Sequence, residues 1–155
     1  MCRLRLLLFF LSLFFFGQAG TAEEREVDPG IQFQTVDLYM NSGKRELAAY
    51  QVEIYYPAET VKIVGVEGGD KQAFQTPPTY DERGFEGGRI ILAAFTEEDT
   101  CPKGRTRVAR IHLALESVEE ADIQGELMAA AEKGGKRFSP RIELRTVPRG
   151  GDSEE

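Results

Sequence analysis

Hydrophobic and polar residues alternate along much of the chain after residue 30. Val36, Leu38 and Met40 alternate with polar neighbours, a period of two that predicts a half-buried strand. The stretch 47–56 continues the pattern and predicts a second strand, ended by Pro57. Its two faces carry Tyr50, Val52, Ile54 and Tyr56 on one side and Gln51, Glu53 and Tyr55 on the other.

Further apolar segments predict more strands. The β-branched run 61–66 predicts a short strand, and Gly65 within it suggests a bulge. Residues 89–96, RIILAAFT, are apolar almost throughout, which predicts a central strand covered on both faces. A strand over 108–115 turns Ile111, Leu113 and Leu115 inward and Arg110 and His112 outward.

The last apolar segments, 123–131 and 138–147, flank the sequence EKGGK. Its Gly134-Gly135 pair predicts a hairpin that joins two strands. Residues 125–133 also contain good helix formers, but the flanking glycines and the short length favour a strand. Segment 67–88 has no steady period and predicts a long loop, with a function or a short strand of its own.

Short strands separated by Gly/Pro turns predict an all-β, antiparallel β-sandwich of the jelly-roll type. The expected organisation is a signal peptide over 1–22, one domain over 30–147 and a disordered tail over 148–155. Because the chain has 155 residues, it has room for one domain of ordinary size.

The first residues follow the three-part layout of a secretory signal peptide. A basic head precedes an apolar run from Leu6 to Phe16, and small residues then suit cleavage after Ala19 or Ala22. The alternative is a membrane anchor, but the run is about half of the roughly 20 residues needed to cross a bilayer. We therefore expect a secreted or periplasmic protein that has no membrane contact after cleavage.

Charge and cysteine content narrow the partner classes. The formal net charge is −7, and loss of the leader makes it more negative, which disfavours nucleic acid and anionic lipid. Only Cys101 remains after cleavage, so no internal disulfide is expected and this thiol is interpreted as a loop residue.

Catalytic motifs are missing from the sequence. His112 is the sole histidine, and the chain has no GxSxG, Walker, HExxH or CxxC pattern. A carboxylate pair from the acidic loops 81–82 and 97–99 is the remaining route to hydrolysis, and solvated loop tips are the simpler interpretation. We predict that the chain is not an enzyme and uses no cofactor or metal.

Aromatic residues suggest binding. Tyr55, Tyr80 and Phe85 belong to a cluster in and after the second predicted strand, and exposed rings stack on sugars or occupy the centres of protein interfaces. The absence of tryptophan weakens the sugar alternative, and packing of these rings in the core is a third interpretation.

Five sequence motifs, taken in their order along the chain, resemble those of the cohesin domain. They are YQVEIYYP at 50–57, the strand ending VEGGD at 66–70, the strand ending AFT at 94–96, PKG at 102–104 and VARIHL at 108–113. The resemblance covers about residues 36–144 and lacks the usual separate first strand before Val36. It implies a nine-stranded sandwich that docks a dockerin through one sheet face, although the partner here need not be a dockerin.

By position, the resemblance makes five outward residues candidates for that partner-binding face: Gln51, Glu53, Tyr55, Arg110 and His112. A polysaccharide-binding module, with Tyr55, Tyr80 and Phe85 as the stacking residues, is the alternative function.

Overall fold

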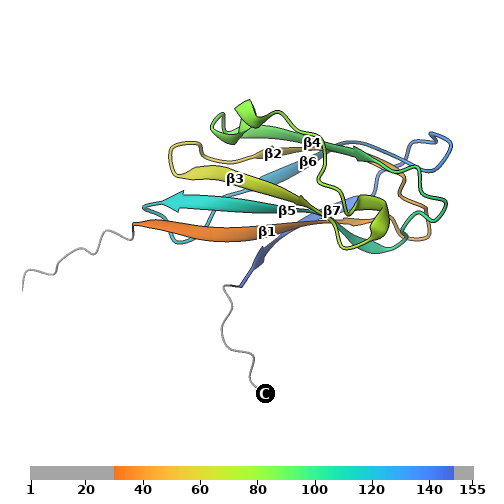
Figure 1. Cartoon of the computed structure of the whole chain (residues 1–155), viewed down its shortest axis with the longest axis horizontal. Coiled ribbons are helices and arrows are strands. Elements are labelled where there is room, and N and C mark those ends of the chain that lie inside the picture. Colours follow the sequence, from red (N-terminus) through yellow and green to blue (C-terminus); the bar gives the residue numbers. More distant parts are fainter. Residues whose placement is uncertain (1–29, 149–155) are drawn as a thin grey trace, which may run out of the picture.

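The computed structural model describes residues 30–148, which form two antiparallel sheets packed face to face (Figure 1). The predicted signal peptide and residues 149–155 of the predicted tail lie outside the described residues. One sheet has the order β3-β5-β1-β7 and the other β4-β2-β6, so the predicted all-β sandwich is confirmed. The strands are β1 (Ile31–Asn41), β2 (Ala49–Tyr55), β3 (Val61–Gly68), β4 (Arg89–Phe95), β5 (Arg105–Glu116), β6 (Gln124–Ala131) and β7 (Arg141–Val147). These are seven strands within residues 30–148, fewer than the nine that the resemblance implies.

The core lies between the sheets and follows the period-two pattern. Val36, Leu38 and Met40 of β1 are fully buried, as are Val52 and Ile54 of β2. The inward residues of β3, β4 and β5 complete one continuous apolar cluster. Burial of these branched side chains is the main stabilising contribution in a fold whose described part contains no disulfide.

A buried hydrogen bond connects the two sheets. The Tyr50 hydroxyl on β2 donates to the Val108 carbonyl on β5 across 3.1 Å. Burial raises the pKa of Tyr50 far above its ordinary value, so the phenol stays protonated and remains a donor. The Tyr50 ring also meets Phe74 edge to face, with centroids 5.4 Å apart.

The predicted hairpin around EKGGK is wrong as a strand pairing. β6 pairs with β2 in one sheet, whereas β7 pairs with β1 in the other. Only the bridge between Ala131 and Arg137 connects the two segments before the chain crosses to the opposite layer. The strand assignment of 124–131 is nevertheless confirmed, against the helical alternative.

The long segment after β3 is ordered by short local structure. It contains two 3-10 turns, η1 (Gln72–Phe74) and η2 (Glu82–Phe85), and Thr79 bridges Ala93 on the edge of β4. The hydroxyl of Tyr56 donates to the Gly84 carbonyl and fastens η2 to the end of β2. The predicted irregularity at Gly65 is confirmed, because the β3–β5 register shifts between Ile63 and Gly65.

Cys101 lies in the loop before β5, as predicted. Its side chain is buried, and its sulfur is 3.8 Å from the Glu98 carbonyl. No helix in residues 30–148 is both long enough and apolar enough to span a bilayer.

Candidate protein-binding face

The five predicted partner-binding residues do not share one face. Gln51, Glu53 and Tyr55 lie on β2, in the three-stranded sheet, whereas Arg110 and His112 lie on β5, in the four-stranded sheet. Each group points away from the core, so the two groups occupy opposite sides of the sandwich. The prediction of a single surface is therefore wrong, because periodicity identifies outward residues but not which strands share a sheet.

The outer side of the three-stranded sheet carries an exposed apolar surface. Its large members are Tyr55 of β2, Ile91 and Phe95 of β4 and Met128 of β6, which are 39%, 37%, 74% and 49% exposed. We call these four residues the apolar face. Small residues, Ala93 and Ala129, lie between them on either side of Gln51.

Strand register brings these side chains onto one side. Ile91 pairs with Glu53 and Phe95 with Ala49, so both β4 residues follow the outward positions of β2. On β6 the register shifts beside Gln51, and Met128 is the extra residue opposite that outward position. The apolar face thus spans all three strands.

The prediction that residues 89–96 form a central strand is wrong. β4 is an edge strand, and only its inner residues Ile90 and Leu92 are buried. A continuous apolar run is typical of a strand covered on both faces. Here the second cover is absent from the described chain, which is typical of a surface that meets a partner.

A buried carboxylate lies at the centre of this sheet. The side chain of Glu53 is only 5% exposed, and the Arg89 guanidinium, 57% exposed, donates to it from the neighbouring strand. A carboxylate withdrawn from water is costly without such a partner. The ion pair makes the middle of the face nearly neutral.

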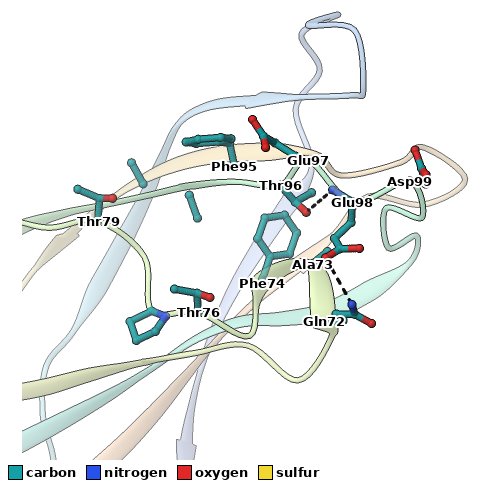
Figure 2. Close-up of a pocket in the computed structure, with 13 residues that line it drawn as sticks. Gln72, Ala73, Phe74, Thr76, Thr79, Phe95, Thr96, Glu97, Glu98 and Asp99 are labelled. Carbon is teal, nitrogen blue, oxygen red and sulfur yellow. Dashed lines mark hydrogen bonds between the residues drawn. The ribbon is translucent and has the colours of Figure 1, made fainter.

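A groove borders the apolar face along the C-terminal half of β4 and the loop after it. Figure 2 shows the Phe95 ring and Glu97 on one side of it, with Phe74, Gln72 and Thr76 on the other. The Gln72 amide donates to Glu98 across 3.4 Å, and the Thr96 hydroxyl accepts from the Glu98 amide. The groove is therefore lined by the Phe74 and Phe95 rings together with polar and acidic side chains.

The acidic loops do not form a catalytic pair. Glu97, Glu98 and Asp99 line the groove at the end of β4, whereas Asp81 lies beside the start of that strand, near Arg89. Asp99 is paired with the Lys133 ammonium at 2.8 Å, whose hydrogen bond and charge lower the pKa of Asp99. Asp81 is paired with Arg83.

The remaining candidate groups have structural partners. Nε2 of His112 is 3.0 Å from a Glu67 carboxylate oxygen, outside hydrogen-bonding alignment, and Nδ1 is 3.3 Å from the Thr35 hydroxyl. Residues 30–148 contain no cluster of three or more His, Cys, Asp or Glu side chains that suits a metal ion. Tyr80 and Phe85 stack on each other, with centroids 5.2 Å apart, and pack against the core.

Comparison with solved structures identifies the architecture. A chain of the Coh-OlpA-Doc918 complex, a type I cohesin–dockerin complex from Clostridium thermocellum, superposes with a TM-score of 0.57 at 14% identity. That match covers 75% of this chain and 87% of the other. The fold is that of a cohesin domain.

Two further structures agree on the cohesin fold. The seventh ScaB type I cohesin of Pseudobacteroides cellulosolvens gives a TM-score of 0.56 at 14% identity, over 83% of this chain and 89% of the other. A CaDoc0917–CaCohA2 complex gives 0.55 at 12% identity, over 70% and 82%. No family model and no curated protein matches the sequence. The cohesin resemblance of the motifs is thus confirmed at the level of the fold.

Proposed function

We propose that this chain is an exported, non-catalytic protein-binding module that docks a dockerin-type partner through its apolar face. The observation that carries the proposal is the set of four large apolar side chains exposed on one flat sheet. Several large apolar side chains exposed on one side of a sheet are typical of a surface that contacts a partner. Two of the three cohesin-fold neighbours are complexes with a dockerin, which supports the class of partner.

Charge around the apolar face indicates the chemistry of the partner. Glu97, Glu98 and Glu126 are exposed at its margins, while the Glu53–Arg89 pair neutralises its centre. A partner with apolar residues in the middle of its contact surface and Lys or Arg at the periphery is complementary to this arrangement. Of the five residues predicted from the sequence, the proposed site includes Gln51, Glu53 and Tyr55. It does not include Arg110 and His112.

The polysaccharide alternative has less support. Sugar binding requires an open aromatic face, and Tyr80 and Phe85 cover each other instead. Tyr55 is the remaining ring of that proposal, and it is 39% exposed. Retention on insoluble cellulose, chitin or xylan that is lost in a Tyr55→Ala variant would favour this alternative over the protein partner.

The test uses purified dockerin modules encoded by the same genome, measured one at a time by calorimetry. We expect at least one to bind and Phe95→Ala to weaken it by about tenfold or more, because Phe95 is the most exposed large apolar side chain of the face. Val64→Ala is the matched control, because Val64 is 52% exposed on β3, in the other sheet. A genome without dockerins, no binding, or equal losses in the two variants would contradict the proposal.

A further inference from the structure

The opposite side of the sandwich concentrates positive charge in an otherwise acidic chain. On β1, β5 and β7, nine outward positions form three rows across the sheet: Arg105–Asn41–Arg141, Arg107–Tyr39–Glu143 and Arg110–Asp37–Arg145. We call these nine residues the arginine grid. It holds five arginines and two carboxylates, a surplus of three positive charges, whereas the whole chain carries −7.

Ion pairs connect the side chains of the grid without neutralising its charge. Asp37 is nearly buried and accepts from Arg110 at 2.7 and 3.0 Å and from Arg107 at 3.4 Å. Glu143 is shared between Arg105, at 3.2 Å, and Arg145. Each carboxylate thus has two guanidinium partners. Glu67 of β3 lies opposite Arg110 and offsets charge on that side, so the surplus positive charge lies towards β7.

Two arginines next to the sheet edge are available to a partner. Arg141 is exposed, and none of the ion pairs within residues 30–148 includes it. The side chain of Arg145 is 63% exposed. Both lie on β7, the last strand of its sheet, and no other strand in the described part of the chain pairs with its outer edge.

We propose that an extended acidic polypeptide segment adds to the free edge of β7 and places carboxylates four residues apart beside Arg141 and Arg145, on either side of Glu143. Strand addition brings opposing outward side chains to about 5 Å, within reach of arginine–carboxylate hydrogen bonds. A second copy of this chain is a poor occupant of the edge. If two β7 strands paired antiparallel and in register, the arginines of one would lie opposite the arginines of the other and repel them. A sugar chain is a less suitable ligand than an acidic peptide. Tyr39, the aromatic residue of the grid, cannot stack on a sugar because the Arg105 guanidinium covers its ring at 3.4 Å.

The probe is a synthetic peptide of about nine residues, a typical strand length or slightly more, with blocked ends. It carries Glu at every fourth position and Thr elsewhere, so that two Glu side chains can face Arg141 and Arg145 without a third facing Glu143. Its affinity for the full chain is measured by fluorescence anisotropy at low salt and at about 0.3 M salt. We expect Gln in place of Glu, or the Arg141→Ala/Arg145→Ala double variant, to weaken binding by about tenfold. Higher salt weakens the wild-type complex, and Arg83→Ala, an exposed arginine on η2, leaves it unchanged.

A second peptide separates strand addition from simple charge attraction. Pro in place of the Thr residues next to each Glu keeps the charge but removes every second backbone donor, so we expect this peptide to bind about tenfold more weakly. Equal affinity of the two peptides, no loss in the arginine double variant, or tighter binding of polygalacturonate or phosphatidylserine vesicles would overturn the proposal. Phe95→Ala must leave this affinity unchanged, which separates the result from the dockerin test.

Discussion

Individual residues stabilise this sandwich through a few buried polar contacts, of which the Tyr50–Val108 hydrogen bond joins the two sheets and the others lie within one sheet. The Tyr50 hydroxyl, the Glu53 carboxylate and the Asp37 carboxylate are all withdrawn from water, and each has a named partner. Unpaired polar groups in such positions cost more than the contacts contribute, so removing one partner is more harmful than the bond energy suggests. Three predictions test these contacts.

Tyr50→Phe removes the hydrogen bond between the sheets while keeping the ring in the core. The Val108 carbonyl then loses this donor, and we expect the free energy of unfolding to fall by about 1–2 kcal/mol. Tyr55→Phe is the control, because that residue lies on the outer face. Urea denaturation of both variants measures the difference, and equal midpoints would show that the bond between the sheets contributes nothing.

Arg89→Ala leaves Glu53 as a buried charge without its guanidinium. Because Arg89 is itself more than half exposed, we expect a moderate loss of about 1–2 kcal/mol in unfolding free energy. Adding Glu53→Gln to this variant removes the unpaired charge and should restore part of the stability. A double variant as unstable as the sum of the single changes would contradict the pairing.

Asp37 makes stability depend on pH in a defined direction. Burial raises its pKa, but hydrogen bonds and charges from Arg110 and Arg107 outweigh that effect, so its folded pKa lies below 3.8. The stabilisation is complete above the unfolded pKa and is lost as pH falls through the folded value.

We therefore expect Asp37→Asn to lower the free energy of unfolding by about 1–2 kcal/mol at neutral pH. The difference in stability between the variant and the wild type should narrow below about pH 4. Urea midpoints measured between pH 7 and pH 3 test this. A gap that is constant over that range would rule out a contribution from the charge of Asp37.

At the scale of elements, the turn after β3 is fitted tightly onto its neighbours. A Cβ added to Gly68 would lie 2.0 Å from the Gln75 carbonyl oxygen, which belongs to the backbone and cannot simply rotate away. Gly65, in the same strand, has room, since its nearest contact would be the His112 ring at 3.9 Å. The two glycines form a matched pair.

Gly68→Ala should therefore destabilise the fold by about 1–3 kcal/mol through overpacking, while Gly65→Ala should cost less than about 1 kcal/mol. Thermal unfolding of the two variants measures the difference. Similar melting temperatures would mean that the turn 68–75 rearranges freely and does not hold one wall of the groove.

Elements were predictable from sequence where the evidence was local. Alternation located β1 and β2 and their inward faces, and the glycines around β6 favoured a strand over a helix. Pairing is nonlocal, so neither the separation of β6 from β7 nor the placement of β5 in the other sheet could be inferred from periodicity. The apolar run of β4 fitted either a strand covered on both faces or an edge strand with one exposed apolar side, and the sheet order shows the second.

At the scale of the whole molecule, the two outer faces differ in chemistry. One carries four exposed apolar side chains with an acidic margin. The other carries the arginines and their carboxylates, and Ile31, Phe33 and Val64 are exposed elsewhere on its sheet. A sandwich with two such faces is suited to contact two different partners at once, because the core separates the surfaces. Binding at one face is therefore expected to leave affinity at the other unchanged.

The most direct test of the central claim is to map the contact surface of the complex with a dockerin by methyl and amide NMR. We predict that binding perturbs Tyr55, Ile91, Phe95 and Met128 and the strands that carry them, and leaves Val64 and the arginines of β7 unchanged. Perturbations confined to the four-stranded sheet would contradict the account.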